Sequence, residues 1–417
     1  MIKTFRIDWV TLIIYFLLII IGILNIYSST YDIENSTYID ADSLAFKQFV
    51  FFIFSLISGL LILIAPSKFF QRFSSLIYLF SILLLIGLFA FGKTVYGHNS
   101  WYSLFGFSIQ PTEIAKFATN LAVAKLLSEI QIDLKKLKSL IQVFLVILIP
   151  IILTLMQPDF GSALIFLSFI FVLFREGLNP NFVLVIGTSM ILAIIALIKP
   201  FFFITIFLTV VCGCIYFLSK KINKKVSLIP LITVFITSCI YVYSISYVYN
   251  DLLSQRHRDR IDIFLGKESD VMGVGYNLNQ SIIAIGSGGI SGKGFLQGTQ
   301  TKGRFVPRQH TDYIFSTIGE EWGFYGTTIV IILFTLLILR ILYRAELQKK
   351  IFGRSYAYGT ASLIFLHFFI NVGMSIGLVP TIGIPLPFVS YGGSNMYTFT
   401  TLIFVYLNLD ANRLNEV

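Results

Sequence analysis

The residues best suited to chemistry lie between positions 304 and 323, where a polar segment runs directly into an apolar one. Asp312 stands where a hydrophobic helix is expected to begin, four residues after Arg308 and two after His310. An ionisable side chain at the rim of a membrane is costly to place, so it is a candidate for function. The alternative is an acid that caps the helix or complements its dipole.

Two further acids and a lysine occupy similarly costly places. Glu113 and Lys116 lie three residues apart in an apolar run, hence on one helix face, and predict an ion pair inside the membrane. Such a pair either lines a substrate cavity or is purely structural. Asp159 lies in a break between two apolar runs, where proline and glycine end a helix. We expect Asp159 to shape a cavity or to hold a cation.

The segment 250–311 carries more basic than acidic residues. Its cations are Arg256, Arg258, Arg260, Lys267, Lys293, Lys302, Arg304 and Arg308. The excess fits either a solvated loop or a binding site for an anionic lipid head group. Residues 286–303 are also rich in glycine, so backbone N–H groups there can approach phosphate oxygens beside Lys293. The spacing is not that of a nucleotide-binding P-loop, and a flexible or re-entrant loop is the alternative.

The composition restricts the class of protein. Of 417 residues, 56% are hydrophobic and 12% are charged, which indicates a membrane protein with many spans rather than a soluble domain. The cysteines lie in or beside apolar runs and are expected to act as small hydrophobes; they are Cys212, Cys214 and Cys239. His367, like the other histidines outside 304–323, shows no metal-ligand spacing and is assigned no chemistry.

Apolar runs of about 17 to 25 residues recur along the chain, each long enough to cross a bilayer as a helix. We predict about twelve spans, at 9–28, 46–65, 76–91, 114–130, 140–156, 163–174, 182–198, 201–218, 228–249, 313–339, 356–378 and 388–409. Basic clusters between them place both termini in the cytoplasm. Segment 250–311 is then a long extracytoplasmic loop before the span that starts near Asp312. The expected fold is an all-α bundle of membrane helices.

Five separated motifs resemble the SEDS family, the polytopic membrane proteins of bacterial shape, elongation, division and sporulation. In chain order they are 110–116 (QPTEIAK), 157–161 (QPDFG), 258–261 (RDRI), 310–323 (HTDYIFSTIGEEWG) and 383–394 (GIPLPFVSYGGS). Together they cover most of the chain. The GTQ of 298–300 and the IPLP of the last motif are more similar to the RodA-like elongation branch than to the FtsW-like division branch.

The resemblance implies a peptidoglycan glycosyltransferase that polymerises lipid II into β-1,4 glycan strands during cell elongation. Its active site would face outward from the bacterial cytoplasmic membrane. Building a β-1,4 chain from an α-linked pyrophosphate inverts configuration, so one general base suffices, and Asp312 matches the family's essential aspartate. The residues expected to bind substrate are Arg258, Arg260, Lys293, Lys302, Arg304, Arg308, His310, Glu113, Lys116, Asp159, Ser390 and Tyr391.

The same resemblance suggests cofactors and partners. Mg²⁺ or Mn²⁺, held mostly by water and phosphate, is expected to assist the departure of pyrophosphate, and no organic cofactor is expected. The expected partners are lipid II, a class B penicillin-binding protein transpeptidase and other membrane proteins of the elongation complex, with no nucleic acid. A lipid II flippase or a non-catalytic scaffold of the cell-wall synthesis complex is the alternative function.

Two features depart from the family pattern. Arg308 follows Pro307 at a position where relatives usually carry an acidic or otherwise different residue, which leaves its role open. Relatives usually have ten spans, whereas 182–249 is expected to hold three spans where they have one. We therefore predict a lineage-specific region with two extra spans inside a single membrane domain of residues 1–417. An even number of added crossings keeps Asp312 on the outer side.

Overall fold

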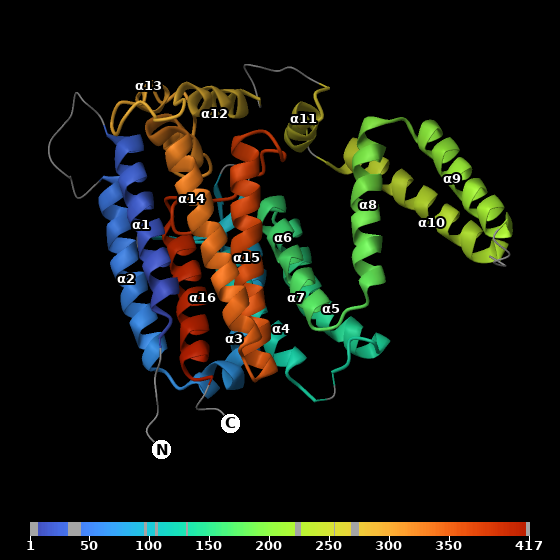
Figure 1. Ribbon diagram of the computed structural model, residues 1–417, viewed down its shortest axis with the longest axis horizontal. Coiled ribbons are helices and arrows are strands. Elements are labelled where there is room, and N and C mark those ends of the chain that lie inside the picture. Colours follow the sequence, from blue (N-terminus) through green and yellow to red (C-terminus); the bar gives the residue numbers. More distant parts are fainter. Residues whose placement is uncertain are drawn as a thin grey trace. The chain divides into compact units, whose positions relative to one another are not determined.

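The computed structural model describes residues 7–31, 43–95, 98–104, 107–130, 132–221, 227–253, 255–267 and 275–413. These residues form a mostly helical protein (Figure 1). The chain divides into two compact units, Met1–Leu178 with Tyr276–Val417, and Asn179–Gly275.

The first unit is a bundle of helices that is closed at one end by two short ones. Its helices are α1 (Trp9–Thr30), α2 (Leu44–Ile64), α3 (Ser67–Phe91), α4 (Pro111–Leu127), α5 (Leu137–Met156), α6 (Phe160–Ile165), η1 (Phe166–Ser168), α7 (Phe169–Arg175), α12 (Tyr276–Ser287), α13 (Thr299–Lys302), α14 (Ile314–Glu346), α15 (Ile351–Ser375) and α16 (Gly393–Ala411). In Figure 1, α12 and α13 lie across one end of the bundle, and α1 begins and α16 finishes at the other.

The interior of the bundle is formed mainly by α4, α15 and α16, whose residues are nearly all buried. Helix α4 begins with Pro111 at its first position, where the missing N–H costs nothing and the fixed φ suits a helix. Helices α1, α2, α3 and α5 surround the interior and leave many large apolar side chains exposed. An apolar outer surface of this extent is expected where lipid, rather than water, surrounds the helices.

Each predicted apolar run overlaps helical structure, but run 163–174 is divided among α6, η1 and α7, and run 388–409 begins five residues before α16. Within the described residues, eight helices are long and apolar enough to span a membrane: α1, α2, α3, α5, α8 (Pro180–Ile198), α10 (Leu228–Tyr247, continuing to Asp251), α14 and α15. Phe160–Arg175 and Phe201–Phe217 are shorter apolar helices. The protein is therefore a multi-pass membrane protein. The number of crossings and their direction stay predictions.

Residues 93–109 form a small sheet that the sequence did not predict. Strands β1 (Lys93–Val95), β2 (His98–Leu104) and β3 (Phe107–Ile109) pair antiparallel in the order β1-β2-β3. Tyr102 lies opposite Ile109, and its hydroxyl donates to the Leu84 carbonyl of α3 at 2.9 Å. Burial raises the pKa of Tyr102. The Tyr102 side chain therefore attaches the hairpin to α3.

A charged cluster joins α1, α14 and α16 at the end of the bundle where α1 begins. Arg340 contacts both carboxylate oxygens of Asp8, its Nη2 lying 2.8 Å from Oδ1, and Arg344 donates to Asp410. Burial by itself raises the pKa of Asp8, but the hydrogen bonds from Arg340 and Thr11 lower it by more. The pKa of Asp8 therefore lies below its usual value. The buried carboxylate of Asp8 is thereby kept charged and paired.

Helix α14 is interrupted by a kink, which corrects the expectation of one continuous span from 313 to 339. Gly323 has φ 61° and ψ −155°, a conformation that side chains disfavour. The glycine-rich segment after α12 packs against this kink. Lys293 N donates to Glu320 O at 3.0 Å, and Phe324 N donates to Gly289 O at 3.0 Å. Glu320 therefore lies against the glycine-rich segment.

The second unit contains α8, α9 (Phe201–Lys221), α10, the π-helical turn η2 (Val248–Leu252) and α11 (Gln255–Phe264). Ala196, Ile204 and Val242 form its small buried core. The Tyr241 hydroxyl of α10 donates to Ser189 O of α8 at 3.1 Å. The unit encloses region 182–249, whose assignment as lineage-specific with two extra spans stays a prediction. Helices α11, α12 and α13 show that much of segment 250–311, expected to be a loop, is helical.

Substitution of Gly292 by alanine should destabilise the bundle strongly. Gly292 has φ 80°, and a Cβ atom there would lie 2.1 Å from Glu321 O, so the segment must separate from the kink. We expect the free energy of unfolding to fall by roughly 2–4 kcal/mol, because the cost of the left-handed conformation and the cost of the overlap with the Glu321 backbone add together. The measurement is the thermal unfolding midpoint of the purified protein in detergent.

Gly286→Ala is the matched control for this substitution. Gly286 lies six residues earlier on α12, and a Cβ atom there meets nothing within 4 Å. Alanine is the better helix former by about 1 kcal/mol, so the midpoint should stay or rise. Equal melting of the two variants would contradict the packing assigned to Gly292.

Candidate functional site

Asp312 lies in an irregular segment, 303–313, that precedes α14. Asn371 of α15 donates to the Asp312 carbonyl at 2.8 Å, which holds the backbone of this residue against the bundle. The Asp312 side chain is 15% exposed, and Arg308 Nη1 lies 3.7 Å from its Oδ2. Tyr313 occupies the N-cap position of α14, and Asp312 is the residue before it, near the positive end of the helix dipole. The carboxylate is fixed, partly exposed and next to a cation.

The loop between α15 and α16, residues 376–392, holds the other side of this segment. The Ser390 hydroxyl donates to Thr311 O at 2.6 Å and accepts from Leu386 N at 2.8 Å. Tyr391 N donates to His310 O at 2.9 Å, and the rings of these two residues are 5.9 Å apart. Ser390, through its hydroxyl, and Tyr391, through its backbone N–H, therefore bind the segment that carries Asp312; both are predicted site residues.

Gly383 and Gln48 complete the surroundings of the loop. A Cβ atom at Gly383 would lie 3.2 Å from Asp312 Oδ2, so this part of the loop borders the carboxylate. Gln48 of α2 accepts from Gly392 N at 3.0 Å, which ties the end of the loop to the bundle. Gln48 is fully buried. Contacts from three separate parts of the chain thus define the position of Asp312.

His310 and Arg308 give the segment its electrostatic character. Burial lowers the pKa of His310, and the charge of Arg308 lowers it further, so the imidazole is neutral at pH 7. Arg308 has φ 56°, in the left-handed region, and its carbonyl accepts from Thr311 N at 3.0 Å. This conformation costs about 1–3 kcal/mol and is held by the contacts around it. Arg308, which departs from the family pattern, is the cation next to Asp312.

The predicted ion pair on α4 is present. Lys116 Nζ lies 2.7 Å from Glu113 Oε1, and both side chains are almost completely buried. The Lys116 ammonium also lies 2.9 Å from His367 Nε2 on α15. Sequence analysis assigned His367 no chemistry, yet it is the neighbour that connects this pair to the rest of the site.

Asp159 is used within the fold. It caps α6, its Oδ1 accepting from Ser162 N at 3.0 Å, and its Oδ2 accepts from Gln110 Nε2 at 3.2 Å. Gln110 N in turn donates to the Ser394 hydroxyl of α16 at 3.1 Å. Asp159 therefore connects the start of α6 to the start of α4 and, through it, to α16.

The predicted phosphate-binding cations separate into groups. Lys293 lies 2.8 Å from Glu320 Oε1, and Glu320 also accepts from the backbone N–H groups of Gln300 and Thr301 at 2.8 and 2.7 Å. Lys302 ends α13 and Arg304 follows it, exposed, with φ 52°. The glycine-rich segment thus carries a network around Glu320 and packs against α14.

Arg258 and Arg260 lie on α11 in the second unit. Arg258 Nη1 donates to Asn250 O at 2.8 Å, which fastens the helix to the preceding turn. Their phosphate-binding role stays a prediction.

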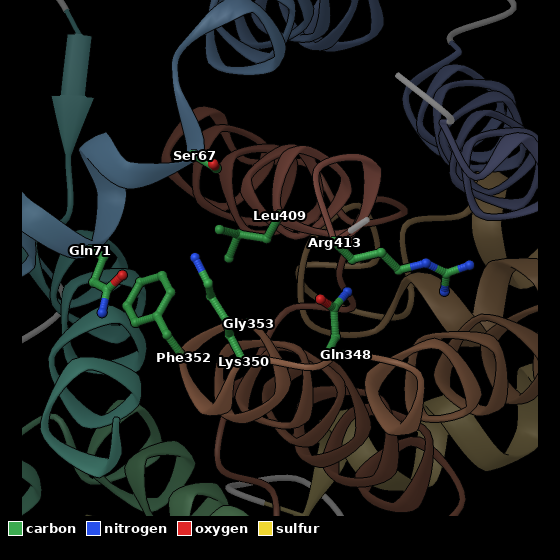
Figure 2. A pocket seen from close by; sticks show the side chains of 8 residues that line it. All are labelled: Ser67, Gln71, Gln348, Lys350, Phe352, Gly353, Leu409 and Arg413. Atoms are coloured by element: carbon green, nitrogen blue, oxygen red, sulfur yellow. The ribbon is translucent and has the colours of Figure 1, made fainter. Parts of the chain in front are cut away.

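A pocket lies elsewhere in the first unit, and Figure 2 shows its lining side chains: Ser67, Gln71, Gln348, Lys350, Phe352, Gly353, Leu409 and Arg413. They come from the start of α3, the α14–α15 connection and the end of α16. None of them is a predicted site residue.

The described residues contain no group of three or more His, Cys, Asp or Glu side chains placed to hold a metal ion. The Mg²⁺ or Mn²⁺ ion expected from the sequence stays a prediction.

Comparison with known proteins identifies the family. The family model for FtsW, RodA and SpoVE, described as "Cell cycle protein", matches residues 8–203 and 180–415. The chain belongs to the FtsW/RodA/SpoVE family. This match confirms the resemblance to the SEDS proteins.

Named relatives are similar over most of their length. The peptidoglycan glycosyltransferase MrdB of Escherichia coli K12 is 32% identical over 360 residues, covering 85% of this chain and 83% of that protein. The peptidoglycan glycosyltransferase RodA of Treponema pallidum is 32% identical over 429 residues, covering 98% of each. A probable peptidoglycan glycosyltransferase FtsW of Saccharophagus degradans is 28% identical.

Solved structures of the family share the fold. A chain from the structure described as "Structural coordination of polymerization and crosslinking by a peptidoglycan synthase complex" aligns with TM-score 0.72 and 24% identity, covering 99% of each chain. The rod shape determining protein RodA of Thermus thermophilus aligns with TM-score 0.63 and 21% identity, covering 98% of each. The helical membrane fold is therefore that of the FtsW/RodA/SpoVE family.

The sequence did not indicate three residues that contact the surroundings of Asp312: Gln48, His367 and Asn371. His367 and Asn371 are four residues apart on α15, so they share one face of an apolar helix. Two polar residues at this spacing in an apolar run indicate a polar face turned toward the interior of the bundle. Gln48 contacts a residue 344 positions away, and no local pattern predicts such a contact.

Proposed function

We propose that the chain is a peptidoglycan glycosyltransferase that polymerises lipid II into β-1,4 glycan strands during cell elongation. The observation that carries the proposal is Asp312, whose backbone carbonyl accepts from Asn371 and whose partly exposed carboxylate is bordered by the last loop. Relatives named peptidoglycan glycosyltransferase support the reaction class, and the relatives MrdB and RodA, at 32% identity, support the elongation branch.

In the proposed reaction Asp312 is the general base. It takes the proton of the acceptor sugar's 4-hydroxyl as that oxygen attacks the anomeric carbon of the donor sugar. The bond from that carbon to the pyrophosphate breaks on the opposite side, and configuration inverts. Pyrophosphate is a good leaving group, so charge neutralisation replaces a second acid.

Cations around Asp312 are proposed to receive the pyrophosphate. Arg308 is placed for this by its contact with the Asp312 carboxylate, and Arg304 and Lys302 precede it on the same segment. Lys293 is left out because Glu320 occupies it. Mg²⁺ or Mn²⁺, held mostly by water and substrate phosphate, would supply further positive charge to the leaving group.

Replacement of Asp312 by asparagine should abolish most glycan synthesis. The change nearly preserves shape but removes the base, and positioned proton transfer typically contributes about 10² to 10⁴-fold. The measurement is polymerisation of lipid II by the purified protein in detergent, with thermal unfolding to verify the fold. Asp133→Asn, at an exposed acid before α5, is the control and should keep the wild-type rate.

A folded Asp312→Asn variant with the wild-type rate would eliminate the general base. A wild-type protein that makes no glycan from lipid II, alone or with its transpeptidase partner, would instead favour the flippase or scaffold. The buried Glu113–Lys116 pair is the feature that a lipid II transporter would use.

The active site is proposed to face outward from the bacterial cytoplasmic membrane. Basic clusters such as the one before α5 are expected inside, which places α12 and α13 outside. In a cysteine-free background, Ser291→Cys should react with a membrane-impermeant maleimide in intact spheroplasts. Lys136→Cys should react only after permeabilisation. Both positions are exposed, and the reverse pattern would invert the topology.

A class B penicillin-binding protein is the proposed partner, bound through the apolar outer surface of the bundle, together with other membrane proteins of the elongation complex. The similarity to a chain of a complex that coordinates polymerisation and crosslinking supports this pairing. The chain should co-purify with its cognate transpeptidase, which should raise its polymerase activity. Absence of a complex, with full activity alone, would count against the pairing.

A further inference from the structure

His367 lies at the junction between the buried ion pair of α4 and the loop beside Asp312. It belongs to α15 and is 1% exposed. Its Nε2 lies 2.9 Å from Lys116 Nζ, and its Nδ1 lies 3.2 Å from the carbonyl oxygen of Pro385. Both ring nitrogens therefore have partners, one on α4 and one on the loop between α15 and α16.

The chemistry of the two partners determines the state of the ring. The Pro385 carbonyl can only accept a hydrogen bond, so Nδ1 must carry a proton. Lys116 forms an ion pair with Glu113 at 2.7 Å, and a lysine ammonium group can only donate a hydrogen bond. Nε2 must therefore be the acceptor, with no proton. His367 is neutral in the Nδ1–H tautomer, and no other state satisfies both contacts.

The loop that His367 contacts is the one that borders the proposed base. Asn371, one turn later on α15, donates to Ile384 O at 2.7 Å and to Asp312 O at 2.8 Å. Two consecutive loop carbonyls, of residues 384 and 385, are thus held by two side chains on one face of α15. Asn371 bonds to Asp312 directly, whereas His367 acts only through the loop.

We propose that His367 is a positioning residue of the Asp312 site. It connects Lys116 of the Glu113–Lys116 pair to the Pro385 carbonyl by hydrogen bonds. This connection holds the loop at a set distance from the Asp312 carboxylate. The inference rests on the proposed function for its effect on rate, but its structural content, the single tautomer and its two hydrogen bonds, does not.

The first test compares substitutions at His367 in the lipid II polymerisation assay. His367→Phe keeps a ring of similar size and removes both hydrogen bonds, so kcat should fall about 10 to 100-fold, since errors near 1 Å are known to cost about 10²-fold. KM should change less than kcat, because the residue does not touch substrate. His367→Asn retains a donor near the Nδ1 position for Pro385 O and should recover more kcat than His367→Gln, whose longer amide reaches only Lys116.

Thr360→Val is the matched control on α15. Thr360 is fully buried, accepts from Asn120 at 3.1 Å and donates to Tyr356 O at 3.0 Å, so these hydrogen bonds go to α4 and α15. It should lose stability to a similar extent while keeping kcat. A folded His367→Phe variant with wild-type kcat, or equal losses in His367→Asn and His367→Gln, would overturn the positioning role.

The second test needs no activity and uses the wild-type protein. With ¹⁵N-labelled histidine, the His367 signals, assigned by their absence in His367→Asn or His367→Gln, should show one protonated Nδ1 and one unprotonated Nε2 at pH 7. A doubly protonated ring or an Nε2–H tautomer would overturn the inference even if lipid II polymerisation is observed. The expected tautomer in a protein that makes no glycan would leave the hydrogen bonds established and reject the proposed function instead.

Discussion

Irregular backbone inside a helical bundle is stable only where protein groups pair with its N–H and C=O groups, because hydrocarbon offers no hydrogen-bond partner. Segments 303–313 and 376–392 meet this requirement together. Ser390 and Tyr391 bond to the carbonyls of Thr311 and His310, and Asn371 bonds to both segments. The position of Asp312 is therefore a consequence of this mutual pairing.

Charge pairing is the second constraint on the bundle, and it separates structural from chemical residues. Buried charges at Glu113, Glu320 and Asp8 each lie within 2.8 Å of a cation, since an unpaired charge in this environment costs several kcal/mol, as an order of magnitude. Asp312 lies 3.7 Å from Arg308, and its carboxylate is partly exposed. A partly exposed carboxylate is accessible to a substrate, whereas Glu320 and Asp8 are buried and paired within the fold.

The glycine-rich segment after α12 shows how one pattern serves different ends. Glycines that permit a close approach to phosphate equally permit a close approach to backbone, and here Gly292 and Gly323 bring the segment against the kink of α14. Lys293, the expected phosphate ligand, neutralises Glu320 beside it. In the same region Arg308, which departs from the family pattern, adopts a left-handed conformation that brings its charge to Asp312.

By itself the sequence determined the membrane class, the twelve helical segments, the Glu113–Lys116 pair and the family, because hydropathy, helical spacing and motif order are local properties. Tertiary structure decided the sheet at 93–109, the kink at Gly323, the network of Glu320 and the contacts of Gln48, His367 and Asn371. These depend on which groups remain without partners once the helices pack. That condition joins residues hundreds of positions apart, and no window of sequence contains it.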